Sequence, residues 1–227
     1  MNRLGLVNEV FKCMHCEGTS LPFKRHSSGK FYRFPPIIGA SGNAPLLFVG
    51  INPRASGSNV SLHESIVENR KAFKELSANR VGKHPYIGKM GLEPHYNLHV
   101  SVTEALFPGV SFETVAAVTE LHFCASADSS GLPAESSKCA DRFLSQVLEV
   151  VSPSVVFAIG RHVERVLQAR ARSWVGNLSV TWPAGVAPVL ILPHPSSYGP
   201  KQELVTFAVA AARRYLRKRK PPAGPLT

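Results

Sequence analysis

The most reactive side chains in this sequence are four cysteines, and their spacing is typical of a metal or redox site. Cys13 and Cys16 form a Cys-x-x-Cys pair, and Cys124 and Cys139 are separated by 14 residues. Structural disulfides are disfavoured in a reducing cytosol, whereas four thiolates ligate a tetrahedral zinc ion or a four-iron cluster. The spacing of the second pair fits an ordinary zinc ribbon poorly. The sequence therefore predicts a four-cysteine centre; four incidental buried cysteines are the alternative.

A second set of polar side chains follows four apolar segments. The segments are rich in Val, Ile, Leu and Ala without strict alternation, which is typical of strands buried on both faces. They are residues 45–49, 114–118, 154–159 and 188–192. The polar residues that come after them include Asn52, Glu120, His194 and Ser196. Ligands of open α/β sheets bind beyond the carboxyl ends of the strands, so we expect the functional site there.

Helical patterns alternate with these strands. Apolar residues recur at helical spacing in residues 61–77, 137–151, 161–171 and 201–216. Strands that alternate with helices favour a parallel sheet with helices on both faces. We therefore predict an α/β three-layer sandwich with a central four-stranded parallel sheet, built by one domain over residues 1–216. Residues 217–227 are basic and rich in Pro and Gly, and we expect a flexible tail there.

The composition favours a polyanionic partner. The chain has 227 residues, a net charge of +11 and an isoelectric point near 9.8. Basic chains often bind nucleic acid, because each neutralised phosphate releases counterions. A basic surface that only aids solubility is the alternative. The sequence has no apolar run of transmembrane length and no pattern of a signal peptide, so we expect a cytoplasmic, nucleoid-associated protein.

The order of these motifs resembles the iron–sulfur branch of the uracil-DNA glycosylase superfamily. The shared features are the first cysteine pair, a Gly-x-x-Pro motif after the first strand, a Thr-x-hydrophobic-x-x-Cys segment, a cysteine at the start of a Phe-Leu helix, and His-Pro-Ser. The resemblance extends from about residue 10 to about residue 216. It implies a pocket for a flipped base and a structural 4Fe-4S cluster. The implied cluster ligands are Cys13, Cys16, Cys124 and Cys139.

The first motif departs from that branch. Gly50-Ile51-Asn52-Pro53-Arg54 is more similar to the Gly-Ile-Asn-Pro-Gly of the mismatch-specific uracil/thymine glycosylases. That likeness implies that Asn52 positions the attacking water and that Gly50 and Ile51 line the base pocket. The alternative for Asn52 is a turn-forming residue before proline. Arg54 stands where the family has a small residue. Its side chain would contact a DNA phosphate or crowd the pocket.

The last motif, His194-Pro195-Ser196, matches the second motif of the superfamily. The resemblance implies that His194 donates a hydrogen bond to the base oxygen where negative charge develops. It implies that Ser196 and the adjacent Ser197 contact the DNA backbone. Tyr198 stands where the family places the residue that fills the space left by the flipped base. An ordinary loop tyrosine is the alternative.

Glu120 is the second departure, because the family has an asparagine that reads the base edge at this position. An ionised carboxylate only accepts hydrogen bonds, so it repels the O4 carbonyl of uracil. Three interpretations remain open. The substrate differs from uracil, Glu120 points elsewhere, or a buried, protonated Glu120 imitates asparagine.

Residues 79–99 read as an insertion relative to the family. The segment is rich in His and Tyr, and we expect a solvated loop. The alternatives are a base-stacking role for Tyr86 or Tyr96 and a metal site formed by the histidines.

Taken together, these features predict a monofunctional DNA glycosylase of base excision repair. It would flip uracil or a related damaged base from DNA and hydrolyse the N-glycosidic bond, leaving an abasic site. We expect it to act as a monomer. One alternative is a catalytically weak nucleic-acid-binding protein that keeps the fold and the cluster. Another is a zinc-stabilised domain of unrelated function.

Overall fold

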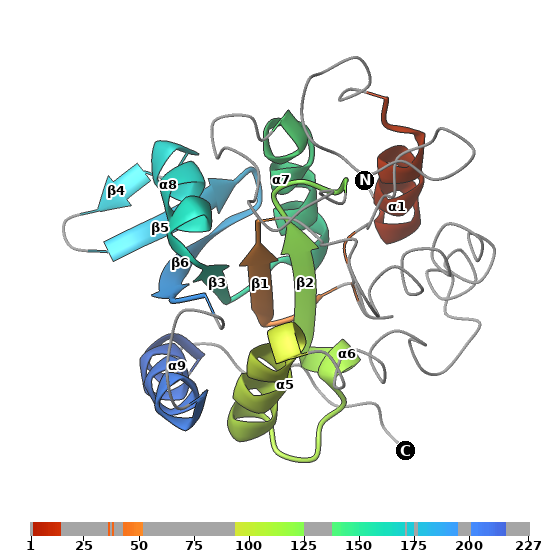
Figure 1. The fold of residues 1–227 in the computed structure, drawn as a ribbon. Helices are drawn as coiled ribbons and strands as arrows, with labels where there is room; N and C mark the ends of the chain where they lie inside the picture. Colours follow the sequence, from red (N-terminus) through yellow and green to blue (C-terminus); the bar gives the residue numbers. More distant parts are fainter. Residues whose placement is uncertain are drawn as a thin grey trace.

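The fold is a six-stranded mixed sheet between two layers of helices, as given by a computed structural model (Figure 1). The structure describes residues 2–14, 36, 38, 43–51, 94–124, 138–170, 172–174, 177–194 and 201–216. Among these residues, no helix is both long and apolar enough to cross a membrane.

Four parallel strands form the part of the sheet that carries the site. They are β1 (Leu46–Gly50), β2 (Ala116–Glu120), β3 (Val155–Ile159) and β6 (Gly185–Leu192). Their spatial order is β2-β1-β3-β6, with parallel pairing throughout. The predicted α/β class and the central parallel strands are therefore confirmed.

Two further strands extend the sheet beyond the predicted four. These are β4 (Arg172–Trp174) and β5 (Asn177–Trp182), which pair antiparallel in the order β6-β5-β4. Neither strand has the sequence pattern of a buried parallel strand, because β4 is very short and β5 places polar residues between its apolar ones.

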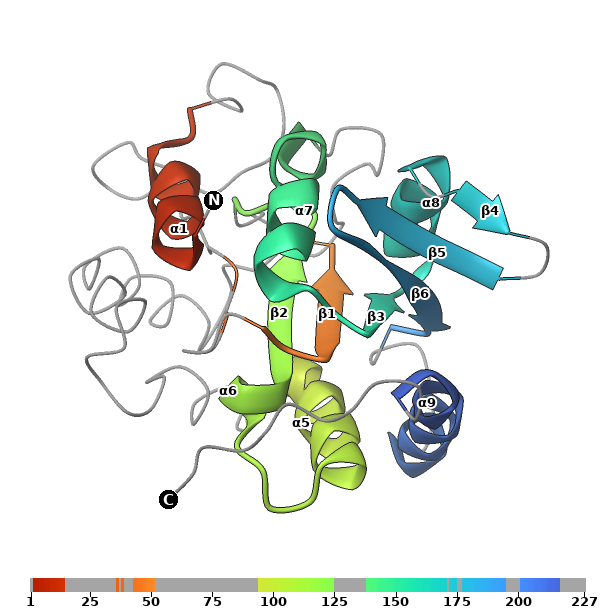
Figure 2. The same ribbon diagram turned by 180° about the vertical axis from the view of Figure 1, so that it is seen from behind.

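Helices cover both faces of the sheet, and alternate strand residues point to opposite layers. Leu47 and Val49 of β1 belong to the core beneath α7 (Lys138–Val151) and α8 (Arg161–Arg170). Leu46 and Phe48 belong to the core beneath α5 (Pro94–Leu106) and α9 (Lys201–Leu216). Figure 2 shows the face on which α7 crosses in front of β2.

The amino-terminal helix α1 (Arg3–Lys12) adds to the α7 layer. It begins at Asn2, whose side-chain oxygen accepts a hydrogen bond of 2.8 Å from the backbone nitrogen of Gly5 and so caps the helix. Leu6 and Val10 pack into the same core as α7. Cys13 follows directly as the C-cap residue, so the packing of α1 fixes where the first cysteine lies.

The interpretation of residues 79–99 as a solvated loop is wrong for its last six residues. Residues 94–99 form the start of α5, and His99 is only 1% exposed. Its ring lies 4.6 Å from that of Phe48, edge to face. Leu98 and Val102 of α5 are buried in the same core, an apolar stripe that the polar residues of the segment obscure in the sequence. Residues 79–93 lie outside the described part of the chain.

The other boundaries shift only slightly. The predicted strand at 114–118 begins later, at Ala116, because the preceding residues form the short helix α6 (Phe112–Val115). The predicted helix 61–77 and the tail 217–227 lie outside the described residues, and the domain limits stay a prediction.

Candidate functional site

The carboxyl ends of the four parallel strands lie at one edge of the sheet. The chain passes from β1 to its neighbour β2 on one side, and later to β3 on the other side of β1. Such a change of direction opens a crevice at the carboxyl edge, where ligands of α/β proteins bind. Gly50 and Ile51 lie at this switch point, at the end of β1 and directly after it.

Gly50 and Glu120 form the last residue pair of β1 and β2. The pairing continues one step further, because the backbone nitrogen of Leu121 donates to the oxygen of Gly50 at 2.9 Å. The nitrogen of His122 then donates to the oxygen of Ile51 at 3.0 Å. These two bonds hold the start of the Gly-Ile-Asn-Pro segment against the chain that leaves β2.

The side chain of Glu120 packs over the α-carbon of Gly50. A β-carbon on Gly50 would collide with Oε2 of Glu120 and would lie 2.7 Å from Cδ. Alternation along β2 puts Glu120 on the same face as Val118, which contributes to the core beneath α5. A larger residue at position 50 would require this carboxyl group to move.

Glu120 is buried, with 4% of its surface exposed. Burial raises the pKa of Glu120 to about 8, because the apolar surroundings disfavour the charged form. The carboxyl group is therefore neutral at pH 7. This state corresponds to the interpretation in which a buried, protonated Glu120 imitates asparagine. Its Oε2 has no hydrogen-bond partner within the described part of the chain. A neutral carboxylic acid can donate through one oxygen and accept through the other.

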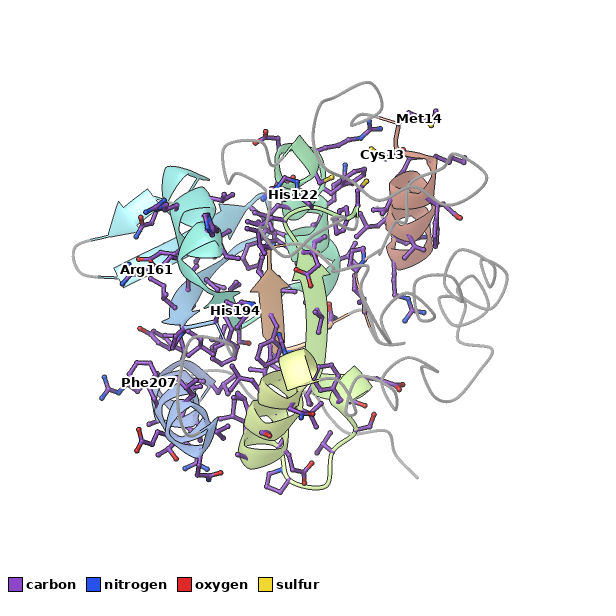
Figure 3. All side chains as sticks on the ribbon, viewed as in Figure 1. Cys13, Met14, His122, Arg161, His194 and Phe207 are labelled. Carbon is purple, nitrogen blue, oxygen red and sulfur yellow. The ribbon has the colours of Figure 1, made fainter. Side chains whose placement is uncertain are left out.

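His194 lies at the carboxyl end of the neighbouring pair, β3 and β6. Gly160 follows β3 with a φ of 91°, and its nitrogen donates to the oxygen of Leu192 at 2.7 Å. A β-carbon on Gly160 would lie 3.5 Å from Cβ of His194, so this left-handed turn packs directly against the histidine. His194 is half-buried, follows β6 in the sequence and lies next to the turn that precedes α8 (Figure 3).

The structure thus places four of the predicted site residues at the carboxyl edge: Gly50, Ile51 and Glu120 on one strand pair, and His194 on the next. The remaining predictions for the base and DNA contacts lie outside the described residues. They are Asn52, Arg54, Ser196, Ser197 and Tyr198.

Cys124 and Cys139 belong to one hydrophobic core, and Cys13 packs against it. Cys13 ends α1, Cys124 follows β2, and Cys139 lies in the first turn of α7. None of these three forms a disulfide within the described part of the chain, and all three border the core cluster that contains Phe123 and Phe143. Figure 3 shows Cys13 beside α1 and His122 near the ends of β1 and β2.

A metal centre stays a prediction. In the part of the chain that the structure describes, no three His, Cys, Asp or Glu side chains lie close enough together to hold a metal ion. Cys16 falls outside this part. Cys13, Cys124 and Cys139 come from separate elements that border one apolar core.

The sequence model of the Uracil DNA glycosylase superfamily matches residues 36–213. The chain belongs to this superfamily. A search of curated proteins finds no match. Membership in the uracil-DNA glycosylase superfamily indicates a DNA glycosylase for uracil or related bases and a role in base excision repair. The matched region begins after Cys13 and Cys16, so the likeness to the iron–sulfur branch stays a prediction.

Sequence reasoning missed two features of the site in this superfamily member. His122 is fully buried directly after β2, and its backbone holds Ile51. In addition, Arg161, His162 and Arg165 form an exposed basic face at the start of α8, immediately after Gly160. The signal for this face was present in the sequence: cations recur at helical spacing just beyond a predicted strand end.

Proposed function

We propose that this protein is a monofunctional DNA glycosylase that flips a deaminated or damaged base into the crevice beyond β1 and β2 and hydrolyses its N-glycosidic bond. The observation that supports this best is the neutral, buried carboxyl of Glu120 at the switch point of a superfamily fold. The reaction leaves an abasic site for base excision repair.

The proposed chemistry divides between two strand pairs. Glu120 binds the base edge from the β1–β2 side. His194, at the end of β6, donates a hydrogen bond to the base oxygen on which negative charge develops as the bond breaks. Asn52 follows Ile51 in sequence and would orient the attacking water; an amide orients water well but is a poor base, so we expect slow turnover.

The four cysteines would hold a 4Fe-4S cluster, with zinc as the alternative. Such a cluster would act as a cross-link between the end of α1, the segment after β2 and the start of α7. Because Cys124 comes only four residues after Glu120, this cross-link would stabilise the loop that borders the base site. No chemical step passes through the cluster.

DNA would lie over the basic face of α8. Arg161, His162 and Arg165 are exposed next to the turn that packs on His194, and the whole chain carries a net charge of +11. Phosphate contacts of this kind position the duplex without reading sequence. We further propose that the protein acts as a monomer in the cytoplasm, associated with the nucleoid.

Single-turnover cleavage tests this proposal. Oligonucleotides that carry uracil, hypoxanthine, xanthine or a 5-substituted uracil, in single- and double-stranded form, are incubated with excess protein and then treated with alkali to break abasic sites. We expect cleavage of at least one substrate. Folded protein that binds these oligonucleotides and cleaves none would instead establish the non-catalytic binding protein.

A further inference from the structure

Helix α9 carries an aromatic side chain that does not take part in the core. Phe207 has 59% of its surface exposed, whereas Val205, Ala208 and Val209 of the same helix pack against the sheet. The other large hydrophobic side chains that are exposed in the described part of the chain are not aromatic. A single exposed apolar residue is ordinary on a protein surface. The neighbours of Phe207 on the helix therefore decide what this ring can bind.

Phe207 and Arg214 lie on one flank of α9. They are two helical turns apart, a separation of about 10 Å, so their side chains leave the helix on the same side. The residues between them on this flank are small: Ala210 and Ala211. The flank faces away from α5, because Arg213 at a different angle donates to a backbone oxygen of α5 at 3.4 Å. Figure 3 shows Phe207 on the side of α9 that lies away from α5.

The charges along this flank are unevenly placed. Arg213 and Arg214 are exposed in the last turn of α9. The sequence continues with four more cations: Arg217, Lys218, Arg219 and Lys220. The carboxylate of the flank, Glu203, is exposed in the first turn, at the other end of the helix. An aromatic ring followed by cations fits single-stranded nucleic acid, whose bases stack on aromatic rings and whose phosphates bind cations.

Helix α9 lies across the sheet from the basic face of α8. The buried residues of α8 belong to one core and those of α9 to the other, so the two helices cover opposite faces. The turn before α8 packs on His194, and α9 begins a few residues after His194 in the sequence. A DNA strand that crosses the edge of the sheet at His194 therefore meets cations on both faces.

We propose that the outer flank of α9 is a path for single-stranded DNA, in which Phe207 stacks on an unpaired base and Arg214 contacts the phosphates. The strand continues from the crevice at His194, while α8 holds the duplex on the other face. The start of α9 and Arg214 are about 20 Å apart, the length of about six stacked nucleotides. The inference rests on the proposed glycosylase function and specifies its substrate as DNA with a single-stranded region beside the target base.

Binding to undamaged oligonucleotides tests this path without the hydrolysis step. The probes are a blunt duplex and the same duplex with a 3′ or 5′ single-stranded extension of about ten nucleotides, within the usual range of single-strand sites. A further probe has an extension of abasic linkers, which keeps the phosphates and removes the bases. Fluorescence anisotropy compares the wild type with Phe207→Ala, Phe207→Trp and Arg214→Ala. Val110→Ala, at an exposed apolar residue between α5 and α6, is the matched control.

Phe207→Ala should lower the affinity for one of the two extended duplexes about tenfold, as for the loss of one stacked base, and leave the affinity for the blunt duplex unchanged. Phe207→Trp should bind like the wild type, because indole also stacks on a base. The abasic extension should bind the wild type and Phe207→Ala equally. Arg214→Ala should reduce the slope of log affinity against log salt by about 0.7 for the extended duplex, the value for one phosphate contact to a single strand.

Three results would overturn the path. They are wild-type binding of both extensions by Phe207→Ala, an equal loss on the blunt duplex, and the same loss in Val110→Ala. Urea unfolding of each variant should match the wild type, because the ring of Phe207 is largely exposed. If Phe207→Ala instead dissociates a wild-type dimer in sedimentation and binds the extensions normally, the flank contacts a second copy of the chain and the path is wrong.

The same probes with uracil at the junction separate this inference from the glycosylase function. Cleavage with no dependence of extension binding on Phe207 would overturn the path and leave the hydrolase in place. Extension binding that depends on Phe207, without cleavage of any damaged base, would support the path and overturn the hydrolase.

Discussion

The carboxyl group of Glu120 occupies the space that a side chain on Gly50 would fill. The two residues are partners at the ends of β1 and β2, so the glycine is required by its neighbour and not by an unusual backbone angle. Glu120, which stands at the end of β2 where the family has asparagine, therefore depends on the small residue Gly50 at the end of β1.

Gly50→Ala tests this dependence. The added methyl group must displace the carboxyl of Glu120, so we expect a loss of about 1–3 kcal/mol in the free energy of unfolding, as in other overpacked cores. Urea unfolding measures the change. The double variant Gly50→Ala/Glu120→Ala should recover part of the loss, because the shorter side chain removes the collision. Additive losses in the double variant would show that the two side chains do not compete for space.

The contribution of Glu120 to the free energy of unfolding should fall as pH rises from about 5 to 8. In this window the unfolded chain ionises Glu120 freely, near the ordinary glutamate value of 4.5, whereas the raised pKa of the folded protein retains the proton up to about 8. The folded state thus binds more protons, and stability decreases with pH. The full difference corresponds to about 5 kcal/mol, at 1.36 kcal/mol per pKa unit.

Urea unfolding of Glu120→Gln from pH 5 to 8 checks this sign. The variant should lack the decrease, so its stability should rise relative to the wild type as pH increases. Glu149→Gln, which removes an exposed carboxylate on α7, serves as the control and should follow the wild-type curve. Parallel curves for all three proteins would place the ionisation of Glu120 outside this window.

Some elements could be predicted from the sequence alone, whereas others are formed by contacts between residues that lie far apart in the chain. Strand β1 is apolar in every position and buried on both faces, so its composition alone predicted it. The start of α5, in contrast, packs His99 on Phe48, a contact between distant parts of the chain that the sequence does not show. The protonation of Glu120 likewise depends on burial, and a sequence shows the carboxyl but not its surroundings. The polar residues that follow the strands could be predicted together with the strands. The carboxyl ends of parallel strands lie at one edge of the sheet, which is where ligands bind.

Replacement of Cys139 by serine should remove the proposed cluster and loosen the contact between α1 and α7. We expect loss of the brown colour and a lower thermal unfolding temperature before any change in the chemistry at Glu120 or His194. Iron analysis and absorbance spectra measure the first effect, and calorimetry measures the second. If the wild-type protein is colourless and contains zinc, the metal is zinc and not an iron–sulfur cluster. If the wild type contains no metal and is fully stable, neither metal is bound.

His194→Ala should reduce the single-turnover rate by about 10²–10³-fold, the typical effect of losing one donor to a developing anion. Affinity for uracil-containing DNA should change much less, since the charge forms only as the bond breaks. Binding and cleavage by the same preparation measure both quantities. Equal losses in affinity and rate would instead make His194 a simple binding residue.

The double variant Arg161→Ala/Arg165→Ala should weaken DNA binding equally for all base sequences. Both arginines are exposed on α8 beside the turn that packs on His194, so each removed phosphate contact should lower the slope of log affinity against log salt by about one unit. Arg142→Ala is the matched control, because this exposed arginine lies on α7 and pairs with Glu9 of α1 at 3.6 Å. An unchanged salt slope in the double variant, or an equal change in the control, would move the DNA path away from α8.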